Sequence, residues 1–191
     1  MYIENLAPIV VFTYNRLWHT KQTIEALQKN DLAEESELYI FSDGPKNKDS
    51  SNEVNDVREY IKKIDGFKKI TIIERDKNWG LARSIIDGVS TVVNEHGKLI
   101  VLEDDLVTSP HFLSFMNANL SLYKDNQKVG SISGYIPHIK NLPDLFFLKF
   151  GASLGWGTWK RVWNTCEFDE NILLSKFNNK NKIYEFSMDG A

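Results

Sequence analysis

The sequence predicts an α/β fold with a mainly parallel sheet flanked by helices. Short apolar runs rich in β-branched residues alternate with amphipathic stretches through roughly the first hundred residues, a rhythm typical of strands joined by right-handed helical crossovers. These runs are apolar at successive positions, which indicates strands buried on both faces. One of them, 99–102, ends in three carboxylates, Glu103, Asp104 and Asp105. In open α/β sheets the ligand crevice lies outside the carboxyl ends of the strands, so we expect these acids at a binding edge.

The expected strands and helices follow in order along the chain. Apolar runs predict strands, the first of them central in the sheet, at 9–12, 38–41, 70–73 and 99–102. Apolar side chains that recur every three or four residues predict the intervening helices at 19–30, 54–64 and 81–96. Thr20 is a possible cap of the first helix, and Gly66 and Gly97 mark the ends of the second and third.

The rhythm changes after the acidic strand. A helix is expected with Ser109 as its cap, Pro110 at its first position and its end near Tyr123. Two further strands are expected at 132–135 and 146–150. The alternation of strands and helices therefore holds best in the part of the chain that precedes the acids.

The composition indicates one sizeable globular domain. Of the 191 residues, 42% are hydrophobic and 26% are charged, and with a formal net charge of -3 no nucleic-acid partner is expected. The single cysteine, Cys166, excludes an internal disulfide and fits a reducing compartment. The apolar run 7–12 is too short for a signal peptide or a transmembrane segment. We therefore predict a cytoplasmic protein without a transmembrane segment, with peripheral membrane contact left open, and a solvated loop or frayed end at 176–182.

Further polar residues are expected at the same edge as the acids. Those that follow the first two strands are Thr13, Asn15, Arg16 and Asp43. An arginine can bind phosphate through two parallel N–H groups, a carboxylate can accept an N–H from a nucleobase, and Asp104 or Asp105 can hold a divalent cation that bridges phosphates. The helix that begins after Gly80 adds backbone N–H groups and a positive dipole end, with Arg83 one turn in. Such a set suits a nucleoside diphosphate.

Each of these residues also has a purely structural interpretation. Acids at a strand end can cap the next helix or pair with a lysine. Arg16 can pair with a surface acid, Asp43 can be a turn residue, and Arg83 can be solvated on its helix. Taken singly, the structural interpretation is favoured for each residue, whereas the whole set favours binding.

Five segments in order resemble the glycosyltransferases of the GT-A fold, and within that fold the N-acetylglucosaminyltransferase I group and bacterial polysaccharide glycosyltransferases. They are PIVVFTYNR at 8–16, SDG at 42–44, NWGLAR at 78–83, LEDD at 102–105 followed by SPHF at 109–112, and LGWGTW at 154–159. A nucleotidyltransferase shares this architecture but normally carries a glycine- and arginine-rich loop after the first strand. Residues 13–16 contain no glycine, which counts against that alternative.

The resemblance implies a Rossmann-like GT-A domain over residues 1–165 that binds a nucleoside-diphosphate sugar, with uridine diphosphate as the expected carrier and Mn²⁺ or Mg²⁺ as the cofactor. It also implies transfer of the sugar, with inversion, to a glycan or glycoconjugate acceptor. It assigns Asp105 to the metal, Arg16 to the diphosphate and Asp43 to the base. The other donor-binding residues that it implies are Phe12, Thr13, Asn15, Gly80, Arg83, Glu103 and Asp104. Ser84 stands where the animal enzyme has a histidine that faces the donor, a departure from the family pattern.

The acceptor side is expected at Gly155 and Trp156, in the segment 151–159 that interrupts the alternation. A tryptophan between glycines can present its apolar face to a sugar ring, because glycines let the ligand approach the backbone closely. Alternatively, Trp156, Trp159 and Trp163 are core residues at helical spacing. We expect Trp159 and Trp163 in the core and Trp156 at the pocket.

The catalytic base of an inverting transfer is not identified in the sequence. It must be a carboxylate within reach of the acceptor hydroxyl, and Asp169 is a candidate only by its position after the Gly-Trp segment. A solvated loop is the alternative role of this stretch. Residues 166–191 are predicted to be the incomplete start of an acceptor region. A nucleotide-sugar-binding remnant without turnover is therefore kept as the alternative function.

Overall fold

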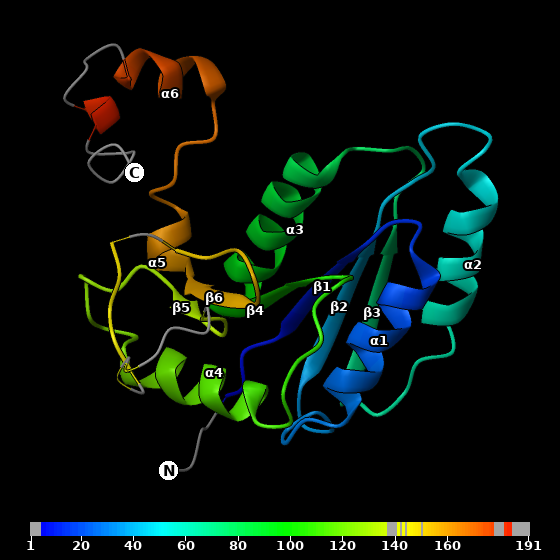
Figure 1. Ribbon diagram of the computed structural model, residues 1–191, viewed down its shortest axis with the longest axis horizontal. Helices are drawn as coiled ribbons and strands as arrows, with labels where there is room; N and C mark the ends of the chain where they lie inside the picture. Colours follow the sequence, from blue (N-terminus) through cyan, green and yellow to red (C-terminus); the bar gives the residue numbers. More distant parts are fainter. Residues whose placement is uncertain are drawn as a thin grey trace.

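The computed structural model describes residues 5–136, 141, 143, 145–149, 151–177 and 182–184. Within these residues one six-stranded sheet has the strand order β3-β2-β1-β4-β6-β5 (Figure 1). Its strands are β1 (Ile9–Thr13), β2 (Glu37–Ser42), β3 (Lys69–Glu74), β4 (Lys98–Glu103), β5 (Ile132–Ser133) and β6 (Trp156–Trp159). The helices are α1 (Leu17–Gln28), α2 (Ser51–Ile61), α3 (Leu81–His96), α4 (Phe112–Leu122), α5 (Lys160–Trp163) and α6 (Glu170–Lys176). The predicted α/β class is confirmed.

The first strand lies in the middle of the parallel part of the sheet, as predicted. β1 pairs in parallel with β2 on one side and with β4 on the other, and β2 pairs in parallel with β3. In this register Thr13 is opposite Ser42, and Phe12 is opposite Glu103. The carboxyl ends of β1, β2 and β4 therefore meet at one edge, which brings together the residues that follow them.

Alternate residues of the strands face two separate cores. On one face Val11, Ile40 and Leu102 are buried under α1, α2 and α4. On the other face Val10 and Phe41 are buried under α3 and α5. Helices thus cover both faces of the sheet (Figure 1), and the continuous apolar runs of the sequence follow from this double burial.

Three predicted helix starts are wrong: the second helix runs over Ser51–Ile61, three residues earlier than predicted and ending before Gly66, and two other starts are wrong by two residues. The first helix begins at Leu17 rather than at residue 19, so Thr20 lies inside it, where its Oγ1 donates to the carbonyl of Arg16 at 3.0 Å instead of capping the helix. The fourth helix begins at Phe112, and the backbone N–H of Phe112 donates to the Ser109 carbonyl at 3.1 Å. Ser109 and Pro110 therefore form a turn before the helix rather than its cap and first position.

The Gly-Trp segment contains a strand that the sequence pattern did not predict. β6 inserts antiparallel between β4 and β5. A Cβ on Gly157 would lie 3.0 Å from the Leu99 carbonyl oxygen and 3.1 Å from the Leu120 side chain, so glycine lets α4 pack directly onto this strand. Trp159 and Trp163 are buried, as predicted. The helical-spacing alternative for these tryptophans is wrong, because β6 ends at Trp159 and only then does α5 begin.

The two strands that were predicted after Tyr123, at 132–135 and 146–150, are largely absent from the described residues. β5 ends at Ser133, so Tyr135 lies outside it and its side chain is exposed. Residues 146–149 form no strand, and Phe150 lies outside the described residues. β5 is only two residues long and pairs with β6. An apolar pattern this short does not define where a strand ends.

The last described helix stands apart from the rest of the protein. α6 has no buried residue and is joined to α5 by an extended segment, which carries it away from the sheet in Figure 1. Its last residue is Lys176, and 178–181 of the predicted solvated stretch lie outside the described residues. Among the described helices, none combines the length and the apolar character needed to cross a membrane.

Candidate functional site

A cavity of about 370 Å³ lies where the carboxyl ends of β1, β2 and β4 meet the first turn of α3. Seven of the predicted donor-binding residues line it, namely Phe12, Thr13, Arg16, Asp43, Gly80, Glu103 and Asp104. The sequence prediction missed several other lining residues, which are Tyr14, Phe41, Lys46, Asn78 and Leu81. Their signal was weak because each belongs to a loop, a strand end or a helix start whose neighbours are set only by the folded chain. The cavity lies at the edge where α/β proteins bind ligands.

Asp43 joins the end of β2 to the start of α3. Its Oδ1 accepts the backbone N–H groups of Gly44 at 2.9 Å and Trp79 at 2.8 Å, and its Oδ2 accepts the N–H of Gly80 at 3.0 Å. The side chain is only 7% exposed. Both the turn interpretation and the binding interpretation therefore have support: Asp43 closes its own turn, and it also faces the cavity.

Arg58 of α2, from outside the cavity, and Asn78, which lines it, hold the loops around Asp43. The Arg58 guanidinium donates to the carbonyl oxygens of Arg75 at 2.6 Å and Asp43 at 3.4 Å. Asn78 donates through its Nδ2 to the carbonyl of Gly44 at 3.0 Å. Because hydrogen bonds from a charged donor are stronger than neutral ones, Arg58 is a positioning residue for this edge of the sheet.

Two arginine side chains, Arg75 and Arg83, stack on the indole ring of Trp79. The guanidinium carbon of Arg75 lies 3.8 Å from the ring centroid, and that of Arg83 lies 4.4 Å away. Arg75 is almost fully buried and donates to the Asp87 carboxylate at 2.8 Å. Such stacks contribute about 0.5–2 kcal/mol each, so they hold the loop before α3. Arg83 was predicted to bind the donor; in this structure it stacks on Trp79 and does not line the cavity.

Arg16 faces the acids at the end of β4. One guanidinium nitrogen, Nη2, pairs with Oδ1 of Asp104, and the other, Nη1, lies 3.1 Å from Oδ2 of Asp105. Burial lowers the pKa of Arg16, but the hydrogen bond and charge of Asp104, with those of Asp105, outweigh it and leave that pKa raised. The structural interpretation of Arg16 as an ion-pair partner is therefore confirmed, although its partners are the predicted donor-site and metal-site acids themselves.

The three acids differ in exposure and in charge balance. Burial raises the pKa of Asp104, and the hydrogen bond and charge of Arg16 offset only part of that effect. Burial together with the charges of Asp105 and Asp104 raises the pKa of Glu103. The side chain of Asp105 is 40% exposed, against 5% for Asp104. Negative charge therefore accumulates at this end of β4 beyond what one arginine balances.

The raised pKa of Glu103 predicts that Glu103→Gln is as stable as the wild-type protein, or more stable, at about pH 7.5. Because the folded-state pKa lies above the unfolded one, stability is lost as the pH rises from the unfolded pKa through the folded pKa. The glutamine does not titrate, so its advantage in melting temperature should shrink as the pH falls towards about 4, near the ordinary glutamate pKa. Thermal melts across this pH range measure the difference.

The control for Glu103→Gln is Glu34→Gln, which replaces an exposed carboxylate before β2. A melting temperature of Glu103→Gln that lies below wild type at neutral pH and rises relative to wild type in acid would contradict the prediction. The control variant shows the change that loss of any surface charge produces.

Two buried hydroxyl groups in the cavity wall have no hydrogen-bond partner among the described residues. These are Oγ1 of Thr13 at the end of β1 and Oγ of Ser84 in the first turn of α3, on side chains of residues only 4% exposed. An unsatisfied buried hydroxyl group is destabilising, and both of these groups belong to residues that line the cavity. Thr13 was a predicted donor residue, and Ser84 was noted as a departure from the family pattern.

The remaining predicted residues lie outside this cavity. Asn15 donates through its Nδ2 to the Glu53 carboxylate at 2.5 Å. Trp156 is half-buried in β6 and stacks on Trp163 with ring centroids 6.0 Å apart. Gly155 is on the other side of β4, where an added Cβ would lie 3.2 Å from the Phe112 ring. The structure therefore does not bring Gly155 and Trp156 to the cavity that holds the predicted donor residues.

Asp169, the candidate base, caps α6. Its Oδ1 accepts the backbone N–H groups of Asn171 at 2.8 Å and Ile172 at 3.2 Å. This is the usual role of an aspartate at a helix start. The side chain does not line the cavity, and in Figure 1 α6 lies apart from the sheet.

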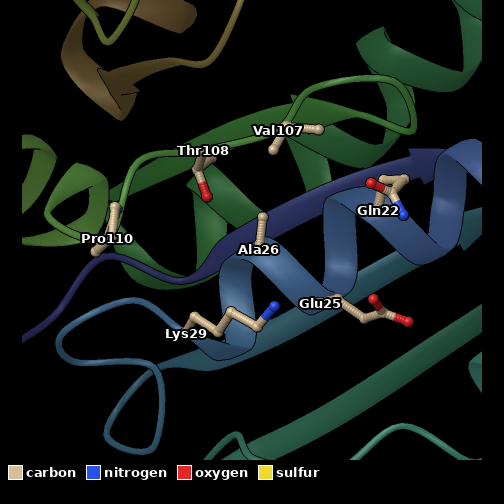
Figure 2. Close-up of a pocket in the computed structure, with 7 residues that line it drawn as sticks. All are labelled: Gln22, Glu25, Ala26, Lys29, Val107, Thr108 and Pro110. Carbon is tan, nitrogen blue, oxygen red and sulfur yellow. The ribbon is translucent and has the colours of Figure 1, made fainter.

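A second, smaller cavity of about 210 Å³ lies between α1 and the loop after β4. Figure 2 shows its lining side chains, with Gln22, Glu25, Ala26 and Lys29 from the helix and Val107, Thr108 and Pro110 from the loop. None of the predicted site residues belongs to it. Val107 is 68% exposed, so the cavity is a shallow feature of the surface.

The acids at the end of β4 fit a divalent cation that is shared with a phosphate ligand. Mg²⁺ is commonly bound by one or two carboxylates together with substrate phosphates, and Asp104 and Asp105 supply two carboxylates at one strand end. No group of three or more acidic, histidine or cysteine side chains in the described part of the chain is arranged to hold a metal ion. The oxygen donors are of the right kind, and water molecules or a diphosphate would supply the remaining ligands.

Solved structures with a related fold include glycosyltransferases. TarS of S. aureus is 15% identical over 63% of this chain and 20% of its own, with a TM-score of 0.47. The mannosyltransferase PcManGT from Pyrobaculum calidifontis, in complex with GDP-Man and Mn²⁺, is 13% identical over 69% of this chain and 36% of its own, with a TM-score of 0.44. A 4-diphosphocytidyl-2C-methyl-D-erythritol synthase from Anaerococcus prevotii DSM 20548 is 13% identical over 94% and 84%, with a TM-score of 0.46.

These likenesses are too low to carry a functional argument, and this chain spans only 20% of TarS and 36% of PcManGT. No curated protein matches the sequence. The family assignment comes from the sequence itself, because the model of Glycosyl transferase family 2 matches residues 9–145, which include β1 to β5 and all of the residues that line the 370 Å³ cavity. The narrower resemblance to the N-acetylglucosaminyltransferase I group stays a prediction. The chain belongs to glycosyl transferase family 2.

Proposed function

We propose that this protein transfers a sugar from a nucleoside-diphosphate donor, bound in the 370 Å³ cavity, to a glycan or glycoconjugate acceptor. The observation that supports it is the meeting of Arg16, Asp43 and Asp104 around one cavity at the carboxyl edge of the sheet, within the segment that the family model matches. The proposed carrier is uridine diphosphate, the proposed cation is Mn²⁺ or Mg²⁺, and the proposed stereochemistry is inversion.

The residues around the cavity divide the work of binding the donor. The two terminal nitrogens of Arg16 form a fork that matches two phosphate oxygens. The Asp43 carboxylate holds the loop before α3 through three backbone N–H groups, and because Asp43 also lines the cavity, a base bound there could donate one further N–H to it. Thr13 and Ser84, whose hydroxyl groups have no partner among the described residues, lie in the wall of the same cavity. Together these contacts orient the donor before any bond changes.

Asp105, together with Asp104, would hold the divalent cation. A bound cation stabilises the negative charge that builds on the departing nucleoside diphosphate. Asp104 and Asp105 place their carboxylates at the end of β4, and Glu103 adds negative charge beside them. The chain's own contribution is therefore a fixed acidic edge opposite the phosphate-binding arginine.

Asp105→Ala tests the proposed function. Uridine diphosphate should raise the melting temperature of the wild-type protein only when Mn²⁺ or Mg²⁺ is present. At a ligand concentration about 100 times Kd the stabilisation is about 2.7 kcal/mol, or about 5–10 °C for a domain of this size. We expect Asp105→Ala to lose this shift, because the exposed carboxylate that would meet the cation is gone. Thermal melts with and without cation measure it.

The matched control is Asp125→Ala, which removes an exposed carboxylate from the turn after α4. It should keep the full shift. An unchanged shift in Asp105→Ala would remove Asp105 from the cation site, and the lack of any cation-dependent shift in the wild-type protein would contradict the proposed donor.

A nucleotide-sugar-binding remnant is the second candidate function. The observation that favours it is the position of Asp169, whose carboxylate caps α6 and does not line the cavity. Release of nucleoside diphosphate from a panel of donor sugars separates the two functions. Turnover supports transfer, whereas saturable binding without release of diphosphate supports the remnant.

A further inference from the structure

We propose that the Arg16 guanidinium and a divalent cation compete for the same carboxylate oxygens, so that this one side chain couples cation binding to diphosphate binding. The inference rests on the proposed function, because it assigns two successive partners to Arg16. The partners in the structure are Asp104 and Asp105. The later partner is the diphosphate of the donor.

The contacts leave a cation little access to Asp104 while Arg16 is in place. Oδ1 of Asp104 pairs with Arg16, and Oδ2 is 3.4 Å from the backbone N–H of Tyr14. The Asp104 side chain is only 5% exposed. Arg16 also spans the gap to Oδ2 of Asp105 at 3.1 Å. A guanidinium that bridges two adjacent carboxylates takes the oxygens that a cation would use, and two like charges at this range repel strongly.

The backbone of Arg16 is fixed by hydrogen bonds, whereas its side chain is free to change rotamer. The carbonyl of Arg16 accepts the Thr20 N–H at 2.9 Å and the Thr20 hydroxyl at 3.0 Å, which fixes the residue at the start of α1. The side chain is 45% exposed, and its described ion-pair partners are the two aspartates alone. Rotation of the side chain therefore breaks only these contacts.

The two ligands then help each other to bind. A cation that displaces the guanidinium frees its N–H fork, and a diphosphate at the cavity offers that fork new anionic oxygens. A diphosphate that attracts Arg16 in turn exposes Asp104 to the cation. By linkage, each ligand raises the affinity for the other by the same factor. If this exchange did not occur, Arg16 would keep its ion pairs with Asp104 and Asp105, and diphosphate would not change the affinity for the cation.

The test measures Mn²⁺ alone, without nucleotide, by titration of the electron paramagnetic resonance signal of free Mn²⁺. Arg16→Met should bind Mn²⁺ about 10- to 100-fold more tightly than wild type, since no charge-assisted hydrogen bond has to be broken. Arg16→Lys, which keeps the charge, should return the affinity towards the wild-type value. In a second titration, uridine diphosphate should raise the Mn²⁺ affinity of wild type by a larger factor than that of Arg16→Met.

Lys46→Met is the matched control, because Lys46 also lines the cavity and also carries one positive charge but has no ion pair with these acids. An equal gain in Mn²⁺ affinity in Lys46→Met and Arg16→Met would overturn the inference, because it would show a general field effect. Unchanged Mn²⁺ affinity in a folded Arg16→Met would also overturn it. Failure of wild type to bind uridine diphosphate with Mn²⁺ would instead remove the proposed function, while the nucleotide-free titration would still decide the competition.

Discussion

Asp43→Ala is expected to lower the free energy of unfolding by about 3 kcal/mol. The substitution removes the acceptor of three backbone N–H groups, on Gly44, Trp79 and Gly80, and hydrogen bonds to a charged group contribute about 1.5–3 kcal/mol each. Water that enters the cavity will satisfy part of what is lost, which keeps the total below the sum. Urea denaturation followed by tryptophan fluorescence measures the loss, with Trp79 itself as a nearby reporter.

Asp43→Asn is the informative companion. The amide keeps one carbonyl oxygen, so it can accept the N–H groups of one side of the loop but not of both. We expect about half the loss seen with alanine. A loss below about 1 kcal/mol in Asp43→Ala, within the range of an ordinary surface substitution, would show that the loop before α3 is held by the arginine stack on Trp79 rather than by Asp43.

Gly44→Ala is expected to cost about 3 kcal/mol, at the upper end of the range for overpacking. A Cβ at this position would lie 2.5 Å from the carbonyl carbon of Lys77 and 2.7 Å from its Cα. Both are backbone atoms, so no side-chain rotation relieves the clash. The loop that carries Trp79 must move away from Asp43, and binding of uridine diphosphate should weaken with stability. Urea denaturation and the melting-temperature shift report the two effects.

Gly97→Ala separates this steric effect from backbone strain. Gly97 ends α3 with a φ of +80°, and an added Cβ there meets nothing within 4 Å. Its cost should be only about 1 kcal/mol, the price of a left-handed conformation for a residue with a Cβ. Equal losses in the two variants would contradict the close-approach explanation for Gly44.

Much of the candidate site was predictable because the fold places strand ends together. Arg16, Asp43 and Asp104 are far apart in the sequence, yet each follows or ends a strand, and parallel strands align their carboxyl ends. Seven of the nine predicted donor-binding residues therefore line the cavity, whereas Asp105, the predicted metal ligand, follows Asp104 just outside its lining. Asn15 and Arg83 were placed correctly near this edge, but their side chains turn to Glu53 and Trp79, which local sequence does not reveal.

The far end of the sheet was less predictable. β6 is a four-residue strand of glycine, threonine and tryptophans, too short and too mixed to show a period of two. Its pairing with β4, more than fifty residues earlier in the chain, supplies the hydrogen bonds that make it a strand. The acceptor-side prediction for Trp156 depended on its position between two glycines, whereas in the strand this side chain stacks on Trp163.

The sequence by itself determined the α/β class, the four strands from β1 to β4, the helices between them and the acids at the end of β4. These features follow from the spacing of apolar residues, because a strand buried on two faces is apolar at successive positions and a helix buried on one face is apolar every three or four residues. Only the tertiary structure decided which groups meet across the site. That Arg16 bridges Asp104 and Asp105, and that Asp43 holds the start of α3, depends on contacts between segments that are adjacent only after the sheet has formed.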